Sequence, residues 1–420
     1  MNMDDMRDII KTLEPLHASL MTNMTIFEST KVSSRQINVH KDGYPIITDE
    51  FWTSKQRQAS SIQEIAYRAC FKPQLPNYFI NRFTQPGDYV YDPFSGRGTT
   101  AIESALCDRN VIANDINPLS IILSSPRIKI PEIHEIKERL STIKLYKDRK
   151  ADIDLSMFYH KDTLGELVSL RDYLIERKAN GNQDYVDDWI RMVATNKLSG
   201  HSKYFFSVYT LPPNQACSPQ KQIEFNEKYG LVPNYKDTKE IMLKKTLELQ
   251  RDITPRLRKS MFEIGEKAVW LVKDAAQTQE IADSSISLVV TSPPFLNVID
   301  YASDNWLRCW FNDIDIESVQ KNITVTNKLD KWKDFMTSVF KELFRIMKPN
   351  GHVAFEVGEV RGGTVKLEEC IVPIGIQTGF EVLAVIINSQ QFTKTSNIWG
   401  VRNNSKGTNT NRIVLLRKPG

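Results

Sequence analysis

The stretch GDYVYDPFSGRGTTAIESAL, residues 87–106, decides the fold that we expect. It begins with a turn and a short β-branched and aromatic run, passes through a loop with Gly96 and Gly98, and ends in a helical pattern. A strand, a glycine loop and a helix in this order form the first unit of a doubly wound α/β sheet. The two glycines let the backbone approach a ligand closely, and Thr99 or Thr100 can cap the helix.

The next predicted strand carries an acid at its end, because Asp115 directly follows the run 111–114. In doubly wound sheets an acid at this place commonly binds the hydroxyl groups of a ribose. The spacing therefore favours a nucleoside cofactor. The third glycine of a dinucleotide fingerprint is missing, since the loop continues Gly98-Thr99-Thr100, and this disfavours NAD.

A second motif, TSPPF at residues 291–295, follows an apolar, β-branched run that predicts a buried strand. The two prolines fix φ and remove two backbone donors, so the carbonyls of Ser292 and Pro293 become stiff acceptors beside the Ser292 hydroxyl. Phe295 supplies a flat face. Such a strand end suits a planar group that carries an NH2, such as the exocyclic amine of a nucleobase. For this motif taken alone, a proline-stiffened turn with a packed phenylalanine is an equal alternative.

Together the two motifs, DPFSGRGTT at 92–100 and TSPPF at 291–295, resemble those of the amino-methyltransferases of DNA. The resemblance implies S-adenosylmethionine as cofactor and N4 of cytosine or N6 of adenine in double-stranded DNA as acceptor. A serine before Pro-Pro resembles the cytosine-N4 subgroup, whereas the adenine enzymes mostly carry Asp or Asn there. The implied fold is α/β, a Rossmann-like methyltransferase sheet that is mostly parallel with an antiparallel C-terminal hairpin, and it carries a large, mainly helical insertion.

The resemblance also assigns residues to the cofactor and to catalysis. Cofactor contacts are expected from the glycine loop, the acid of the second strand, an upstream Phe-x-Pro segment at the methionine end, and an acid after the third strand at the adenine: Asp92, Pro93, Phe94, Gly96, Gly98, Thr99, Thr100, Asp115, Phe71, Lys72, Pro73 and Asp274. The expected catalytic residues are Ser292, Pro293, Pro294 and Phe295. A plain loop before a helix at 71–73 and a simple turn acid at 274 are the alternatives.

For the reaction we expect the target base to rotate out of the duplex and to stack on Phe295. The Ser292 hydroxyl and the Pro293 carbonyl then accept the amine hydrogens, which frees the nitrogen lone pair for attack on the sulfonium methyl group. No strong base is expected, since the methylated amine becomes acidic. Arg97 stands between the two glycines, and we expect its side chain to point away from the cofactor and toward DNA phosphate.

The order of the motifs predicts three regions. Residues 1–60 are expected to form an N-terminal helical extension, irregular after residue 30. Residues 61–125 and 263–420 are expected to form the catalytic methyltransferase domain. Its later strands are predicted at 268–272, 286–290, 352–357, 380–388 and 412–417.

Between the two halves of the catalytic domain, residues 126–262 change from strand–helix alternation to helical stripes. The resemblance makes this insertion the target-recognition region. Its span 200–215 is rich in aromatic and amide side chains, which suits contacts with bases and phosphates. An aromatic mini-core with a Pro-Pro turn is the alternative for this span.

The composition is ordinary for a chain of 420 residues, with 41% hydrophobic and 25% charged residues. No apolar run approaches the ~18–20 residues of a membrane helix, and the N-terminus lacks a signal-peptide pattern. Five cysteines without a CxxC pair and six histidines without an HxxxH pair predict neither disulfides nor a metal site. We therefore expect a cytoplasmic protein without structural metal, as a monomer or weak dimer.

The net charge of +4 is too small to identify a nucleic-acid partner. Three alternatives stay open: the same fold acting on adenine N6, a methyltransferase of RNA, and a recognition subunit that has lost catalysis. Ser292 disfavours the first, the large insertion disfavours the second, and the intact Ser292-Pro293-Pro294 acceptors disfavour the third. A restriction–modification system, with a cognate restriction endonuclease that acts on the same site, is implied by the resemblance only.

Overall fold

The computed structural model describes residues 12–13, 36–51, 59–68, 70–211, 216–294, 301–322, 328–360, 364–389 and 410–420. Phe295 and nearly all of the predicted N-terminal helix lie outside the described residues.

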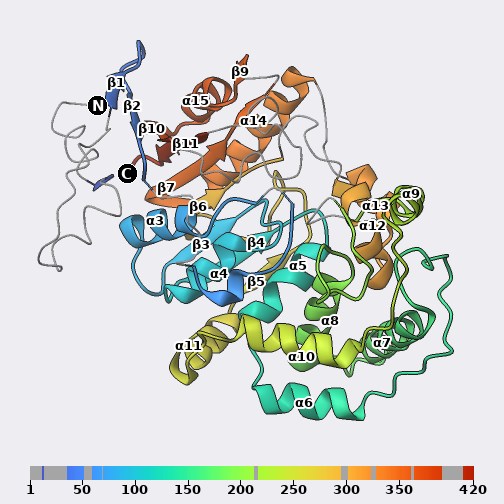
Figure 1. The fold of residues 1–420 in the computed structure, drawn as a ribbon. Helices are drawn as coiled ribbons and strands as arrows, with labels where there is room; N and C mark the ends of the chain where they lie inside the picture. Colours follow the sequence, from blue (N-terminus) through green and yellow to red (C-terminus); the bar gives the residue numbers. More distant parts are fainter. Residues whose placement is uncertain are drawn as a thin grey trace, which may run out of the picture.

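The described strands form a nine-stranded sheet and a separate two-stranded one (Figure 1). The large sheet has the order β1-β2-β10-β11-β7-β6-β3-β4-β5. Its strands are β1 (Gln36–Val39), β2 (Pro45–Asp49), β3 (Tyr89–Asp92), β4 (Asn110–Asn114), β5 (Val269–Leu271), β6 (Ile286–Thr291), β7 (Met347–Val357), β10 (Glu381–Ser389) and β11 (Thr410–Arg417). The small sheet pairs β8 (Glu359–Val360) with β9 (Val365–Lys366).

Within the part of the sheet ordered β7-β6-β3-β4-β5, all neighbouring strands are parallel. Strand β11 is antiparallel to both of its neighbours, β7 and β10. The order reverses at β3, where β4 lies on one side and β6 on the other. In open α/β sheets such a switch point is where ligands bind, at the carboxyl ends of the strands. The predicted mostly parallel sheet with an antiparallel C-terminal hairpin is confirmed.

Helices and two 3-10 turns connect the strands. They are η2 (Ser61–Gln63), α3 (Gln74–Phe83), α4 (Thr99–Leu106), α5 (Leu119–Ser124), η3 (Ser125–Arg127), α6 (Ile133–Thr142), α7 (Lys161–Ala179), α8 (Tyr185–Lys197), α9 (Pro219–Tyr229), α10 (Thr238–Leu249), α11 (Pro255–Gly265), α12 (Tyr301–Phe311), α13 (Ile316–Asn322), α14 (Leu329–Ile346) and α15 (Glu368–Gln377).

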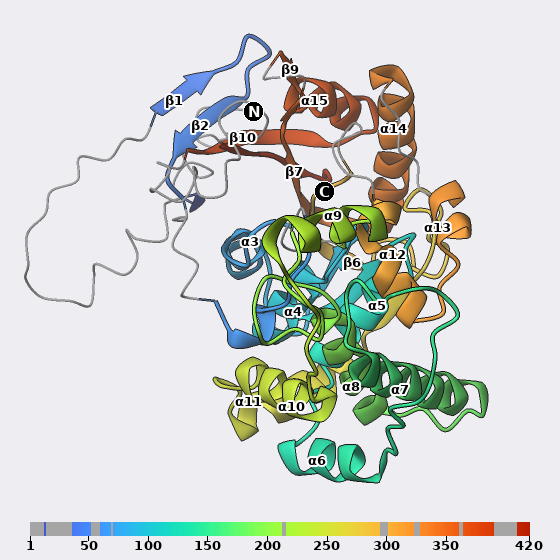
Figure 2. The ribbon, with the colours of Figure 1, turned by 45° about the vertical axis from the view of Figure 1, so that its right-hand side comes forward.

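Both faces of β6 are buried, as its apolar sequence predicts. Leu288 and Val290 point into a core that includes Phe79 of α3, whereas Val289 points into the core under α14 and α15. Figure 2 shows α14 and α15 together on the same side of β7 and β10. The strand is thereby held between two helical layers, and its carboxyl end is the part that emerges.

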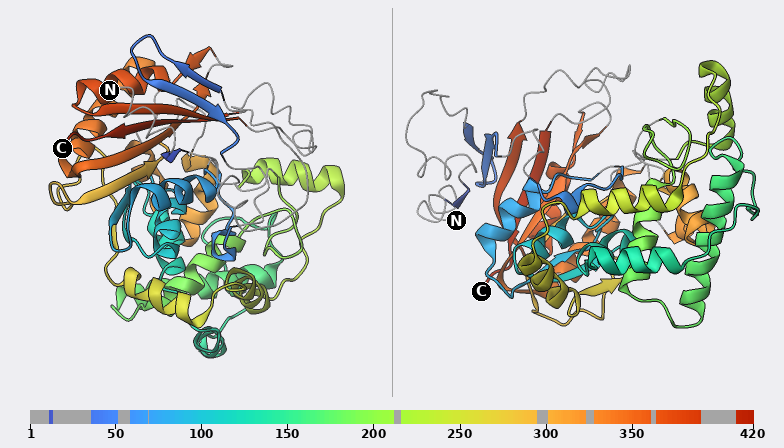
Figure 3. Two further views of the ribbon diagram at one scale, coloured as in Figure 1. Left: turned by 90° about the vertical axis from the view of Figure 1, so that its left-hand side faces the viewer. Right: turned by 60° about the horizontal axis from the view of Figure 1, so that its bottom comes forward.

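Two strand predictions near the ends of the chain are wrong. Residues 36–49, expected to be irregular, form the β1–β2 hairpin, and β2 adds in parallel to the edge of β10 (Figure 3). The alternating burial of β2 explains this, since Pro45, Ile47 and Asp49 point inward. The fifth parallel strand begins at Met347 rather than His352. A register shift against β6 lets the chain bulge out around Pro349, which has no N–H to give to the ladder.

The helical insertion shares its core with the sheet. One continuous apolar cluster includes Ala105 of α4, Leu119 of α5, Trp189 of α8 and Met242 of α10. Helix α11 packs directly on α4 and β4, although it lies at the end of the predicted insertion. The insertion helices are therefore one side of the same molecule, seen below the sheet in Figure 1. The boundaries of the domains stay a prediction.

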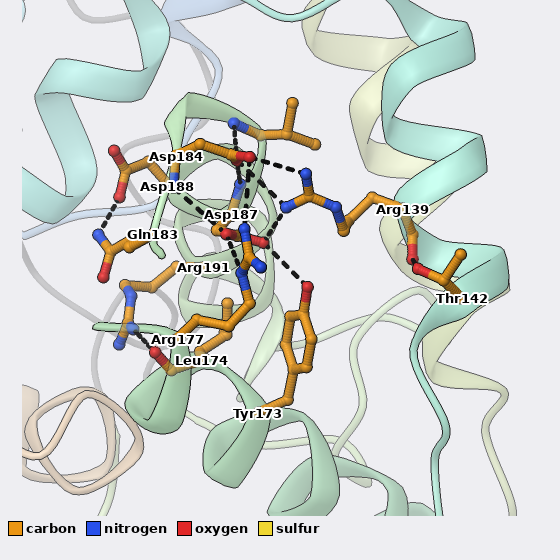
Figure 4. A network of polar contacts seen from close by, with 11 residues as sticks. Arg139, Thr142, Tyr173, Leu174, Arg177, Gln183, Asp184, Asp187, Asp188 and Arg191 are labelled. Carbon is orange, nitrogen blue, oxygen red and sulfur yellow. Dashed lines mark hydrogen bonds and ion pairs between the residues drawn. The ribbon is translucent and has the colours of Figure 1, made fainter. Parts of the chain in front are cut away.

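A buried carboxylate fastens three of the insertion helices together (Figure 4). Asp187, in the first turn of α8, is fully buried and binds Arg139 of α6, while Arg177 Nε of α7 donates to it at 2.6 Å. The Tyr173 hydroxyl of α7 donates to the same carboxylate at 3.2 Å. Asp184 caps α8 and accepts from Arg139 at 2.7 Å. Two guanidinium groups thus neutralise two carboxylates at the junction of α6, α7 and α8.

We predict that Asp187→Ala lowers the free energy of unfolding by about 3 kcal/mol, because it leaves partly buried guanidinium groups without their anion. Asp172→Ala, at an exposed position of α7, is the control and should change it by less than about 0.5 kcal/mol. Urea denaturation of both variants measures the difference, and equal losses would contradict the role given to Asp187.

Candidate active site at the carboxyl ends of β3, β4 and β6

The glycine loop after β3 is shaped by two residues with positive φ. Gly96 has φ +51° and Gly98 has φ +77°. A Cβ atom on Gly98 would lie 2.3 Å from Ser124 Oγ, so the loop rests directly on the end of α5. The loop is tied to β4 as well, because Ser95 N donates to the Asn114 carbonyl at 2.9 Å. Side chains larger than hydrogen do not fit beneath this loop.

The two threonines after the glycines do not cap α4, which corrects that prediction. Gly98 is the N-cap residue, and no side chain caps the helix there. The Thr100 hydroxyl instead donates to the Val290 carbonyl of β6 at 3.0 Å. Thr99 Oγ1 accepts from Arg97 Nε at 3.2 Å. Both hydroxyls therefore hold neighbouring segments rather than the start of their own helix.

Asp115 follows β4 and lies against the glycine loop. Its carboxylate accepts from Gly96 N at 2.8 Å and from Asn117 N at 2.9 Å. Burial raises the pKa of this carboxyl group, and the two backbone hydrogen bonds oppose the rise. Each carboxylate oxygen has a second lone pair, so the group keeps acceptor capacity for a hydroxyl.

Asp92 joins the two motifs that the sequence places about 200 residues apart. The Asp92 carboxylate, wholly buried at the end of β3, accepts from Thr291 Oγ1 of β6 at 2.6 Å and from Phe94 N at 3.1 Å. Burial raises the pKa of Asp92 to about 7, against these hydrogen bonds. Since β3 and β6 are adjacent parallel strands, the glycine loop and Ser292 emerge at the same edge of the sheet.

The Ser-Pro-Pro segment is held by α14 and by β7. Trp332 Nε1 of α14 donates to the Pro294 carbonyl at 3.0 Å, which leaves this carbonyl occupied. The Pro293 side chain is buried, and Ser292 is half-buried. The Ser292 side chain lies close enough to the carboxylate of Glu356, which follows Phe355 in β7, to lower the pKa of that group. Thr291 pairs with Phe355 across the β6–β7 ladder, so this contact follows from the register.

Glu356 is the functional candidate that sequence reasoning missed. It lies near the carboxyl end of β7, is buried, and also accepts a hydrogen bond from Asn411 Nδ2 of β11. Burial raises its pKa, and the hydrogen bonds from Asn411 and Ser292 oppose the rise. The signal was a lone acid in the apolar run His352–Val357. Such a carboxylate can accept a proton at a pH where an exposed glutamate is already ionised.

Four of the residues predicted to bind cofactor lie outside the glycine loop, and Pro73 among them lines a cavity beside Arg97. Asp274 is exposed, and its Oδ1 accepts from Ala276 N at 2.9 Å, so it caps its own turn. Phe71 packs against the apolar cluster around α3, and burial lowers the pKa of Lys72. Pro73 begins α3. Their contacts with a cofactor stay a prediction.

Two cavities lie near the candidate site, and of these only the second has a glycine-loop residue, Arg97, in its lining. One of about 660 Å³ lies beyond β4 and β5 and has Ile116, Pro118 and Val272 among its lining residues. The other, of about 310 Å³, has Pro73 and Arg97 among its lining residues. The first is large enough for a nucleoside half of a cofactor. Asp274 does not line it.

Arg97 does not point toward a DNA surface, which corrects that expectation. Its guanidinium Nη1 donates to the carbonyls of Gln63 at 3.2 Å and Ile65 at 2.8 Å. These carbonyls belong to a segment, Ile62–Ala66, that we call the clamp segment. All five carbonyls of the clamp segment accept hydrogen bonds from cationic or amide side chains. Arg127 donates to Ile62, Arg97 to Gln63 and Ile65, and Lys245 to Glu64. The Ala66 carbonyl accepts from both Asn196 and Arg308.

The clamp segment connects four parts of the molecule. Its donors come from the glycine loop, η3, the insertion helices α8 and α10, and α12 downstream of Ser-Pro-Pro. Arg127 is the most buried of them; it also binds the Arg97 carbonyl, and burial lowers its pKa. The position of the glycine loop is thus fixed from the insertion side as well as from the sheet.

The strand order and the two motifs at the switch point are those of the α/β methyltransferase fold. Comparison with known proteins narrows this class. Residues 23–122 match a family model described as DNA methylase. The type II methyltransferase M.BsoBI of Geobacillus stearothermophilus is 26% identical over 309 residues, which are 66% of this chain and 59% of that protein. The type II methyltransferase M.MjaII of Methanocaldococcus jannaschii is 34% identical over 74 residues, 18% of this chain and 14% of that protein.

Among solved structures, a SAM-dependent methyltransferase from Methanosarcina mazei covers 81% of this chain and is covered to 97%, with 11% identity and a TM-score of 0.34. The resemblance to DNA amino-methyltransferases is confirmed at the level of the family by the sequence matches. These matches fit cytosine N4 and adenine N6 equally. The chain spans about three fifths of the length of M.BsoBI and far less of M.MjaII.

In the described part of the chain, no group of three or more His, Cys, Asp or Glu side chains is arranged to hold a metal ion. None of the helices that the structure describes has both the length and the apolar character needed to cross a membrane.

We predict that Gly98→Ala destabilises the fold more than Gly181→Ala does. Both positions have positive φ, +77° and +68°, and an alanine there costs about 1–2 kcal/mol. A Cβ at Gly181 meets no atom within 4 Å, whereas a Cβ at Gly98 overlaps Ser124, which should add about 1–3 kcal/mol. Thermal and urea denaturation measure both losses, and adding Ser124→Gly to Gly98→Ala should recover only the second part. Equal losses at 98 and 181 would contradict this packing.

A second prediction concerns pH. The folded protein keeps the Asp92 proton up to a pKa of about 7, whereas the unfolded chain releases it near its usual ~3.9. Between these values the folded state binds more protons, so the free energy of unfolding falls as pH rises. Asp92→Asn keeps an acceptor for Thr291 and removes this dependence, which is worth on the order of 4 kcal/mol across the window.

The control for this experiment is Asp88→Asn at the start of β3. Burial raises the pKa of Asp88, but hydrogen bonds from Gln85 N and Ser287 and the Lys348 ammonium lower it on balance. Its stabilisation is present at neutral pH and is lost on acidification, the opposite sign to that of Asp92. Urea unfolding at several pH values compares the variants. Parallel curves for wild type and Asp92→Asn would refute the raised pKa.

Proposed function

We propose that the protein is a DNA methyltransferase that moves a methyl group from S-adenosylmethionine to the exocyclic N4 amine of a flipped-out cytosine. The observation that carries this proposal is the Asp92–Thr291 hydrogen bond, which sets the glycine loop beside Ser292 at one edge of the sheet. The family match and the type II relatives support DNA as the substrate. Ser292 before Pro-Pro supports cytosine over adenine.

The residues around the glycine loop suit S-adenosylmethionine. The loop 92–100 turns through two glycines with positive φ at the carboxyl end of β3, the place where sheets of this kind bind nucleotides. Asp115 has acceptor capacity for ribose hydroxyls, and the cavity beside Ile116 and Val272 has room for the adenine. When bound, the cofactor supplies a methyl group on a positively charged sulfur. Phe71, Lys72, Pro73 and Asp274 complete the proposed set.

The protein's own groups prepare the amine. In this proposal the Ser292 hydroxyl turns toward the nearby Glu356 carboxylate and donates its hydrogen there, so that the Ser292 oxygen presents its lone pairs to the amine. The Pro293 carbonyl accepts the second amine hydrogen, and Phe295 stacks on the base. Positioned acceptors of this kind supply most of the rate enhancement, because they are fixed before the reaction begins.

Glu356 receives the proton that the methylated amine must lose. The proton moves from the amine nitrogen to Ser292 Oγ while the Ser292 hydrogen moves to the Glu356 carboxylate. The raised pKa of Glu356 suits this task, since the group binds a proton more readily than an exposed glutamate does. This adds a base to the mechanism that the sequence alone did not call for.

The proposal is tested by incubating the protein with methyl-labelled S-adenosylmethionine and duplex DNA or RNA, followed by digestion to nucleosides. N4-methylcytosine supports the proposal. N6-methyladenine or a labelled RNA nucleoside would replace it with an alternative substrate, and no transfer would leave a recognition subunit. A cognate endonuclease in a restriction–modification system remains part of the proposal and needs a separate search for cleavage of the unmethylated site.

We predict that Ser292→Ala lowers kcat by about 10²-fold, as loss of one positioned hydrogen bond does, while cofactor affinity is unchanged. Glu356→Gln should lower kcat too and remove the acidic limb of the pH–rate profile. That limb should lie above the ordinary glutamate range of about 4.3, because burial raises the pKa of Glu356.

The matched control is Glu103→Gln in α4. Burial raises the pKa of Glu103 to about 7, against hydrogen bonds from Gln63 and Asn77, but this carboxylate lies away from the end of β6. Single-turnover rates as a function of pH should keep their acidic limb in this variant. Near-normal turnover in Ser292→Ala, or an unchanged pH profile in Glu356→Gln, would defeat the proposed roles.

A further inference from the structure

Four lysines lie near one another at the junction of α8 and α10, and two of them lie over the ring of one exposed tyrosine. The members of this lysine–tyrosine cluster are Lys197, Lys203, Tyr204, Lys244 and Lys245. Lys244 Nζ lies 3.3 Å from the Tyr204 ring centroid, and Lys203 Nζ lies 5.2 Å from it. Residues 203 and 204 belong to the aromatic span of the insertion, and both are exposed. Phe206 and Thr210 of the same span are buried, whereas His201 is exposed.

The cluster carries more positive charge than its surroundings neutralise. Among the described ion pairs, one carboxylate pairs with a lysine of the cluster: Glu248 Oε2 lies 3.6 Å from Lys245 Nζ. The nearby Glu64 carboxylate is paired with Arg251 at 2.8 Å. Burial, and then the charges of Lys245 and Lys244, lower the pKa of Lys197 to about 8. Four ammonium groups beside one carboxylate repel one another, so an anion bound here would be favoured.

Two members of the cluster are buried rather than solvated. Lys197 and Lys245 are each only 6% exposed. Lys197 Nζ lies 4.4 Å from the Phe205 ring centroid, and Lys245 Nζ donates to the Glu64 carbonyl at 2.6 Å. The exposed pair, Lys203 and Lys244, stands in front of them. A solvated surface of separate lysines would not be built in this way, because burying ammonium groups is costly.

The cluster adjoins the proposed active site through the clamp segment. Lys245 holds the Glu64 carbonyl, and Arg97 of the glycine loop holds the next one, Ile65. Tyr67, which follows the clamp segment, passes 3.7 Å from the position of a Cβ on Gly96. The clamp segment thus connects the cluster to the glycine loop.

We propose that the lysine–tyrosine cluster binds backbone phosphates of the DNA duplex next to the target base. This inference rests on the proposed function and extends it to a defined contact surface. Ammonium groups and a tyrosine hydroxyl are donors that suit phosphate oxygens, and such contacts position a duplex without reading its sequence. Contact with the cluster holds the duplex in register while the base is taken out.

The test measures binding of the whole protein to a duplex of fixed length and sequence over a range of salt concentrations. Lys203→Gln and Lys244→Gln should each weaken binding by about tenfold near 0.1 M salt and make the slope of log K against log salt less steep by about one. The double variant should combine the two losses. Lys244→Arg keeps the charge and should keep the slope.

The control is Lys259→Gln on α11, an 81% exposed lysine whose nearest acid, Glu263, is 4.0 Å away. It should leave both affinity and slope unchanged. Thermal denaturation checks the fold of every variant, and the exposed positions of Lys203 and Lys244 should make them neutral.

Each outcome decides the inference. Wild-type slopes in Lys203→Gln and Lys244→Gln would overturn it, as would a wild-type protein that does not bind duplex DNA. Tighter binding of duplex RNA than of DNA would overturn the choice of nucleic acid. Methyl transfer is assayed in parallel: transfer with unchanged slopes rejects the surface and leaves the proposed function, whereas altered slopes without transfer support the surface and reject the function.

Discussion

A single hydrogen bond from the Thr291 hydroxyl to the buried Asp92 carboxylate links the two strand ends on which the site depends. This bond is shielded from water, and a hydrogen bond in such an interior is electrostatically stronger than one exposed to solvent. Without it, β3 and β6 would still pair, but their emerging ends would be free to separate. Thr100 adds a parallel tie from the helix to the Val290 carbonyl. Two hydrogen bonds, one from Thr291 and one from Thr100, therefore hold the segments at the switch point together.

The parts of the fold that follow from local sequence were predictable. The strand, glycine loop and helix can be recognised within twenty residues of sequence. The buried strand before Ser-Pro-Pro can be recognised as a short apolar run. The parts that depend on distant pairing were not. The β1–β2 hairpin is short and weakly patterned, and only the free edge of β10 makes it a strand pair. The start of β7 at Met347 was missed because Pro349 lies inside the strand, and proline is typical of strand ends and turns.

The candidate site shows the same division. The glycines, Asp115 and Ser292 were found because their motifs are contiguous. Glu356 was not, because its contact with Ser292 arises from the register between β6 and β7, and a lone acid in an apolar strand has no sequence signature. The direction of Arg97 was misjudged for a related reason. Its partners are backbone carbonyls more than thirty residues upstream. Every residue has a backbone carbonyl, so the amino-acid sequence does not indicate which of them an arginine will bind.

The clamp segment has a consequence for how proteins of this kind diversify. Five adjacent peptide oxygens accept hydrogen bonds from side chains of the inserted helices, the glycine loop, η3 and α12. The inserted helices therefore cannot be exchanged independently of the rest of the fold. A set of helices taken from another protein would have to bring an ammonium group opposite Glu64, or else leave that oxygen without its donor, whereas Ala66 would keep Arg308 of α12. Substitutions on the exposed surface of the insertion should then be tolerated more readily than replacement of the whole module.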